Sequence, residues 1–355
     1  MGKRWATVYA ILCTLFMVAG FVVAFLFAWR AGEKQALACL LSMVLGFIVA
    51  PIFHELGHLF FLSLHKMECV YIKCFCFKGY IKNGKKRFAL TSPFKADETQ
   101  AIPKCGGNMK KRAAAYTLGG LIFSLILLCI LVGGALTCTL LGGFSYGLWG
   151  AVPYVAYLFL LNIAPFEYAN GKTDMAVYLG IKKGEDAETV MLSAMEIQGQ
   201  LYAGKSFAQI DEDLYFKLPQ LCEDEPLYAL LLDLRYRYYL EKEDLQNAAD
   251  SLNRLVQAQA YLTEIEVQKI AAELTYMHAL NGDLERAEES GKLCRAYLQE
   301  ETPAAKRILA AYSAAFGKNE AVEPLIEQAK SSLKKERIAG VKRFEEILIS
   351  RIKAV

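Results

Sequence analysis

Apolar residues dominate four long stretches of the first half of the chain, at about residues 6–29, 37–64, 113–137 and 146–165. An α-helix needs about 20 apolar residues to cross the hydrocarbon core of a bilayer, and each stretch has about that length or more. Four such stretches without interleaved charge are not typical of helices in a soluble core. The pattern therefore predicts a mainly α-helical protein with about four transmembrane helices.

The segment between the second and third stretches has a different pattern. Apolar and polar residues alternate in CVYIKCFCFKGYIKNGKKRFAL, residues 69–90, as in a β-strand with two unlike faces. The pair Asn83-Gly84 is typical of a tight turn between two antiparallel strands. The segment therefore predicts a small β-hairpin that lies on the membrane surface or dips into it.

The second half of the chain is rich in helix-forming residues and poor in proline, and we expect it to be soluble and all-α. Asp244 and Ala248 recur 39 residues later as Asp283 and Ala287, and Ala321 belongs to a weaker third copy. This spacing resembles degenerate tetratricopeptide-like helical hairpins. An irregular helical bundle is the alternative. An array of hairpins would offer a concave surface to a peptide or protein partner.

Charge separates the two halves. Residues 1–175 contain 17 Lys and Arg against 7 Asp and Glu, whereas residues 176–355 contain 23 against 30. This asymmetry predicts two domains, a membrane-embedded one over 1–175 and a helical one over 176–355. Twelve of the basic residues lie within 66–112. Because basic loops stay in the cytoplasm, we expect this loop, the N-terminus and the helical domain on the cytoplasmic side of a cell membrane, of bacterial type.

One apolar stretch carries ionisable residues. His54, Glu55 and His58 lie within VAPIFHELGHLFFL, residues 49–62. Histidines four residues apart lie on the same face of a helix and can bind one Zn²⁺ ion. Zinc lowers the pKa of a bound water to about 7, and Glu55 could then take its proton. Because an acid inside a membrane costs about 2.5–3.5 kcal/mol, these residues predict a functional metal site.

A third metal ligand is expected from elsewhere in the chain, unless two chains dimerise around the metal. His65 lies about 10 Å further along the helix axis than His58, which is too far for the same ion. A carboxylate near the end of the fourth apolar stretch is therefore expected. Two carboxylates fit this description, Glu167 and Asp174, and the residues alone leave both open.

The HExxH sequence in the second stretch and the sequence NIAP, which begins at Asn162, together resemble the site-2 protease family of intramembrane zinc metalloproteases. The resemblance covers about residues 35–180. It implies a catalytic core of three membrane spans in which two histidines, His54 and His58, and one aspartate hold zinc. It also implies that Glu55 is the catalytic base.

The aspartate segment departs from the family pattern, in which Asp-Gly follows the proline by five residues. This chain has Asn170-Gly171 there, and Asp174 follows. The resemblance favours Asp174 as the third zinc ligand, reached by a longer loop. Glu167 is the alternative ligand, and an inactive site is a further alternative. Asn162 would contact the substrate backbone or the oxyanion, or would cap the end of a helix.

Two further features resemble the same family. Gly119 and Gly120 match its glycine-containing middle span, although close helix packing alone would also explain them. The basic hairpin resembles the family's membrane-associated sheet, which can pair with an unwound substrate strand.

The sequence is therefore interpreted as a zinc metalloendopeptidase that cleaves transmembrane or signal-type peptides near the cytoplasmic leaflet. The alternative is a non-catalytic membrane adaptor that has the same core and presents the helical domain to a protein partner. The expected partners are the lipid bilayer and a membrane-protein or peptide substrate, and we expect no nucleic acid.

Overall fold

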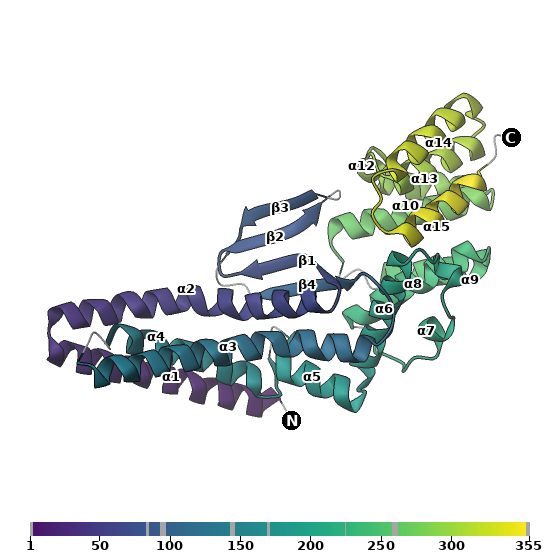
Figure 1. The fold of residues 1–355 in the computed structure, drawn as a ribbon. Helices are drawn as coiled ribbons and strands as arrows, with labels where there is room; N and C mark the ends of the chain where they lie inside the picture. Colours follow the sequence, from purple (N-terminus) through teal and green to yellow (C-terminus); the bar gives the residue numbers. More distant parts are fainter. Residues whose placement is uncertain are drawn as a thin grey trace. The chain divides into compact units, whose positions relative to one another are not determined.

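The chain is mainly helical and has a small β-sheet (Figure 1). Its internal contacts divide it into two units, Met1–Ile102 with Asn108–Glu188, and Pro103–Gly107 with Thr189–Val355. The first unit therefore extends past residue 175, where the sequence predicted the boundary. The computed structural model describes residues 3–82, 85–92, 97–142, 146–168, 171–223, 225–257 and 262–352.

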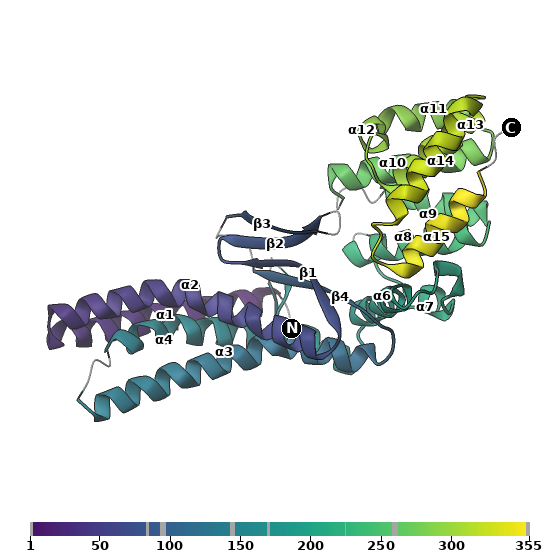
Figure 2. The ribbon, with the colours of Figure 1, turned by 45° about the horizontal axis from the view of Figure 1, so that its top comes forward.

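Four helices of the first unit are long and apolar enough to cross a membrane, as the hydrophobic pattern predicted: α1 (Lys3–Ala31), α2 (Glu33–Leu64), α3 (Met109–Leu140) and α4 (Tyr146–Ile163). They lie side by side (Figures 1 and 2). Large apolar side chains such as Leu15 (60% exposed) point away from the bundle. Outward-facing apolar side chains suit a lipid environment, so these helices indicate a membrane protein.

Glycines set the spacing between the spans. A Cβ on Gly57 of α2 would overlap the carbonyl oxygen of Gly119 on α3. A Cβ on Gly119 would in turn lie 2.5 Å from the carbonyl oxygen of Gly57. The backbones of α2 and α3 therefore meet at this pair, the close approach that small residues allow in membranes.

A four-stranded sheet follows α2, so the predicted hairpin is part of a larger element. The strands are β1 (Met67–Cys74), β2 (Phe77–Lys82), β3 (Lys85–Leu90) and β4 (Glu98–Pro103), in the order β3-β2-β1-β4. The antiparallel pairing of β2 with β3 confirms the hairpin, while Asn83 and Gly84 lie outside the described residues. A second tight turn contains Phe75 at φ 51°, and the alternating pattern gave no signal for it.

The sheet has unlike faces. Phe77 pairs with Leu90, and Gly79 pairs with Phe88, so these residues share one face. Phe88 and Leu90 are 83% and 73% exposed. Arg87 lies on the opposite face, because side chains alternate along a strand. Lys86 shares the face of Phe88 and Leu90, but two large apolar side chains exposed side by side are unusual for a surface in water.

The second unit consists of helices. Neighbouring helices pack in pairs, α8 with α9 and α10 with α11. In each pair, an aspartate of the recurring sequence lies at the start of the second helix. Asp283 caps α11 by accepting a hydrogen bond from the Arg286 amide, and Asp244 accepts one from the Asn247 amide. Ala248 and Ala287 are fully buried four residues after each aspartate. The helices are α6 (Asp186–Tyr202), α7 (Asp213–Phe216), α8 (Pro226–Glu241), α9 (Leu245–Gln257), α10 (Glu264–Leu280), α11 (Leu284–Leu293), α12 (Arg295–Leu298), α13 (Pro303–Ala315), α14 (Asn319–Leu333) and α15 (Ala339–Ser350), with a 3₁₀ turn at Phe207–Gln209.

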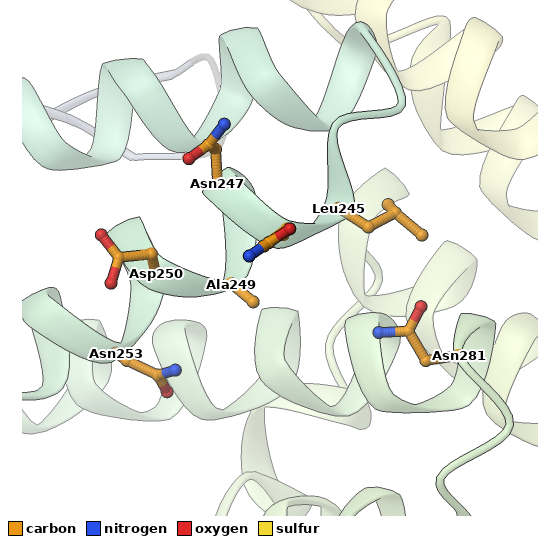
Figure 3. A pocket seen from close by; sticks show the side chains of 7 residues that line it. Leu245, Asn247, Ala249, Asp250, Asn253 and Asn281 are labelled. Atoms are coloured by element: carbon orange, nitrogen blue, oxygen red, sulfur yellow. The ribbon is translucent and has the colours of Figure 1, made fainter.

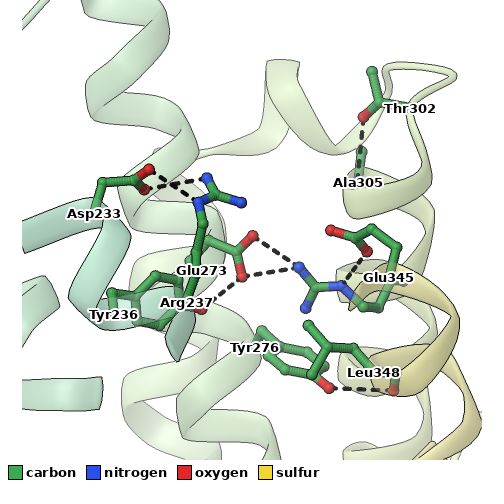
Figure 4. A network of polar contacts seen from close by, with 10 residues as sticks. Asp233, Tyr236, Arg237, Glu273, Tyr276, Thr302, Ala305, Glu345 and Leu348 are labelled. Carbon is green, nitrogen blue, oxygen red and sulfur yellow. Dashed lines mark hydrogen bonds and ion pairs between the residues drawn. The ribbon is translucent and has the colours of Figure 1, made fainter. Parts of the chain in front are cut away.

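A buried ionic network joins α8, α10, α13 and α15 (Figure 4). The Arg307 side chain is fully buried, and its guanidinium lies 2.7 Å from Glu273 and 2.8 Å from Glu345. It also stacks 4.2 Å above the centroid of the Tyr276 ring. The Tyr236 hydroxyl donates a 2.8 Å hydrogen bond to Glu273. Removing one member of such a network leaves a buried charge without its partner.

Candidate metal centre

Three ligand atoms from two distant parts of the first unit meet at one point. The His54 Nε2 atom lies 3.1 Å from Asp174 Oδ2, and His58 Nε2 lies 3.5 Å from the same oxygen. The two Nε2 atoms are 3.3 Å apart. The histidines lie one turn apart on α2, where both are buried. Asp174 begins helix α5 (Asp174–Lys183).

A short hairpin brings Asp174 to the histidines. After α4, strands β5 (Glu167–Tyr168) and β6 (Gly171–Lys172) pair with each other and lengthen the loop. The Thr173 hydroxyl then donates a 2.7 Å hydrogen bond to the Ala164 carbonyl, and its oxygen accepts a hydrogen bond from the Ala176 amide to cap α5. This hairpin is the physical reason why an aspartate four residues beyond the expected place can still reach α2.

Partners on α3 determine which imidazole nitrogens are available. His58 Nδ1 lies 2.9 Å from the Tyr116 carbonyl oxygen, which can only accept, so Nδ1 carries the proton and Nε2 presents a lone pair. His54 Nδ1 lies 2.9 Å from the Ser124 hydroxyl, whose oxygen can likewise accept a hydrogen bond from Nδ1. Such outer partners orient the histidines of metal sites. In the neutral tautomers with the proton on Nδ1, both Nε2 lone pairs would face the Asp174 carboxylate oxygen.

The three atoms fit a cation. Three electron-rich atoms at this distance repel one another unless a positive charge lies between them. Asp174 Oδ2 is buried and receives no hydrogen bond in the described part of the chain.

Spacing and donor type favour zinc. Tetrahedral zinc with bonds of about 2.0–2.1 Å places neighbouring ligands roughly 3.3 Å apart. The three separations between the ligand atoms, 3.1, 3.3 and 3.5 Å, lie around this value. Two imidazoles and one carboxylate are also a donor set found in catalytic zinc sites, where a fourth position stays open. Among the described residues, only this group could hold a metal ion with three ligands.

Gly120 on α3 keeps the space beside the ligand atoms open. A Cβ at this position would lie 2.5 Å from His58 Nε2 and 2.6 Å from His54 Nε2. From the sequence, Gly119 and Gly120 could be either a feature of the family or residues that only let helices pack closely. In the structure the two differ: Gly119 lets the helices approach, and Gly120 makes room at the imidazoles.

Glu55 lies beside the histidines and is 4% exposed. Its carboxylate accepts a hydrogen bond from the Thr99 hydroxyl of β4. The Tyr116 hydroxyl donates to the Thr99 carbonyl, so β4 is attached to both α2 and α3. Sequence reasoning did not single out Thr99, because a threonine in a basic loop carries no local sign of a partner 44 residues away.

The other candidate residues lie apart from this group. Glu167 is exposed on β5 and pairs with Lys172 across the small hairpin. Asn162 is half-buried, and its amide donates a 3.1 Å hydrogen bond to the Leu158 carbonyl of its own helix. His65 follows the last residue of α2. The role expected for Asn162 stays a prediction.

The second unit contains a polar groove of about 570 Å³. Side chains of α9 line it together with Asn281, which follows α10 (Figure 3). Carboxamide groups predominate among them, and such groups both donate and accept hydrogen bonds. The groove is lined by Leu245, Gln246, Asn247, Ala249, Asp250, Asn253 and Asn281.

No protein-family model, curated protein or solved structure matches the chain.

Proposed function

We propose that the chain is an intramembrane zinc metalloendopeptidase of the site-2 protease type. The observation that carries this proposal is the convergence of His54, His58 and Asp174 beside a buried glutamate. A zinc ion bound there would polarise the scissile carbonyl and lower the pKa of a water molecule to about 7. Glu55 would accept a proton on its carboxylate and deliver it to the leaving amine.

The substrate class follows from the depth of the site. His58 lies six residues before Leu64, the last residue of α2, which is about 9 Å of helix, and the basic Lys66 follows two residues later. The scissile bond would therefore lie inside the bilayer, in a transmembrane or signal-type peptide that unwinds locally. The basic 66–112 segment favours the cytoplasmic leaflet, with the N-terminus and second unit on that side.

The proposal is tested with the full-length chain in detergent or nanodiscs and a reporter transmembrane peptide. Glu55→Gln should keep about one zinc per chain and abolish cleavage. His54→Ala and Asp174→Ala should lose the zinc. Glu167→Gln is the matched control, because it neutralises an exposed carboxylate outside the metal group. A zinc-free wild-type chain, or cleavage by Glu55→Gln, would contradict the proposal.

A membrane adaptor is the second candidate. The observation that favours it is the polar groove of the second unit, whose carboxamides suit the backbone of an extended peptide (Figure 3). In that case the chain would bind a protein partner without cleaving it. Metal analysis separates the two candidates, since the adaptor does not require zinc.

A further inference from the structure

A groove of about 420 Å³ lies between α3 and α5 in the first unit. Three exposed lysines line it where α3 begins and α5 ends. Its other lining residues are partly apolar and include small side chains of α3. Its lining includes Lys110, Lys111, Ala115, Leu118, Tyr178 and Lys182.

The positive charge of this groove is not compensated. Lys110 Nζ donates a 3.3 Å hydrogen bond to the Lys182 carbonyl, and Lys182 Nζ lies 5.5 Å from the centroid of the Tyr178 ring. Neither contact supplies a full negative charge. Within the described ranges, no carboxylate forms an ion pair with Lys110, Lys111 or Lys182. The mouth of the groove therefore favours an anion.

The groove continues from this basic end toward the membrane. Lys111 and Leu118 are seven residues apart on α3, which is about 10 Å along the axis of a helix that can span a bilayer. Ala115 lies between them and leaves room for a ligand. A small free anion would fill only the basic end. A ligand with an anionic head and an apolar chain would fill both ends.

We propose that this groove binds an anionic phospholipid, with its phosphate among the three lysines and the start of an acyl chain along Ala115 and Leu118. Clusters of lysines at the membrane surface recognise anionic headgroups in this way. The binding proposal requires only that α3 spans the membrane, and it does not require hydrolysis.

The lipid would also act on the metal centre. Asp174, Tyr178 and Lys182 follow one another at intervals of four residues on α5, so they lie on one side of this helix. A lipid that contacts α3 and α5 together would hold α5 in the position that presents Asp174 to the histidines. This consequence rests on the proposed function, whereas the lipid site does not.

The test uses the full-length chain in vesicles of phosphatidylcholine with and without phosphatidylglycerol. The chain is released into mild detergent, and retained lipid is identified by native mass spectrometry. The variant Lys111→Gln/Lys182→Gln removes two groove charges. The matched control, Lys66→Gln/Lys183→Gln, removes two charges from exposed lysines outside the groove. Each lysine near an anionic headgroup contributes about fivefold to binding, so the groove variant should bind phosphatidylglycerol about 25-fold more weakly than the control.

Three outcomes would overturn the lipid site: equal retention by the groove and control variants, equal retention of both lipids by the wild type, or displacement of the lipid by glycerol phosphate alone. A second readout is the rate at which a chelator removes zinc. Phosphatidylglycerol should slow this removal severalfold in the wild type and in the control, but not in the groove variant. If lipid retention behaves as expected and zinc release does not, the site stands and its coupling to Asp174 is wrong.

Discussion

The Thr99 hydroxyl of β4 donates a hydrogen bond to the carboxylate of Glu55 on α2. This contact connects the surface sheet with the proposed catalytic base. Through this contact the sheet holds a residue of the proposed site, in addition to any role in binding the substrate. A hydrogen bond to a charged group contributes about 1.5–3 kcal/mol, enough to affect both the position and the proton affinity of the carboxylate.

Thr99→Val should slow cleavage of a reporter peptide by about 10- to 100-fold, because it removes the hydroxyl and keeps the shape of the side chain. Zinc content should stay at the wild-type level, since Thr99 does not contact the ligand atoms. Thr99→Ser keeps the hydroxyl and should retain most activity. Equal cleavage rates for the valine and serine variants would show that the contact does not position Glu55.

Gly120→Ala should reduce zinc binding strongly, because the new methyl group would lie 2.5–2.6 Å from the Nε2 atoms of both histidines. Metal analysis of the purified chain measures the effect. Gly133→Ala on the same helix is the control, since apart from the adjacent residues and the local helix backbone no described atom lies within 4 Å of the added methyl group. Similar zinc content in the two variants would mean that Gly120 does not protect the metal centre.

Arg307→Ala should destabilise the second unit by about 3–5 kcal/mol, because it leaves Glu273 and Glu345 buried without their cation. Pulsed hydrogen exchange of peptides from this unit, in the full-length chain across a urea series, measures the shift. Lys330→Ala breaks an exposed pair with Glu327, which water screens, and should leave stability nearly unchanged. A comparable effect of both substitutions would contradict the role given to the buried network.

The apolar face of the sheet should contact lipid. In a chain whose tryptophans are replaced by phenylalanine, Phe88→Trp should give blue-shifted fluorescence that brominated lipids quench. Arg87→Trp, one residue away on the opposite face, should stay in a polar environment and be quenched much less. The reverse order of quenching would place the other face of the sheet against the membrane.

Several features were predictable because they depend on neighbours in sequence. Four long apolar stretches correspond to four helices of spanning length, since crossing a bilayer requires a continuous run of apolar residues. The spacing of His54 and His58 placed both imidazoles on one helix face. The recurring aspartate and alanine of the second unit likewise reflect a local rule, a helix cap followed one turn later by a buried small residue.

Tertiary structure alone decided which distant residues meet. The residues by themselves left Glu167 and Asp174 both open, and the resemblance favoured Asp174. The β5–β6 hairpin with the Thr173 cap places Asp174, rather than Glu167, at the imidazoles. The contact of Thr99 with Glu55 likewise depends on where β4 lies against α2. These contacts join residues tens of positions apart, and their formation depends on how whole helices and strands pack. Hydrophobic periodicity indicates which face of one helix or strand is buried. It does not indicate which side chain of another helix or strand packs against that face.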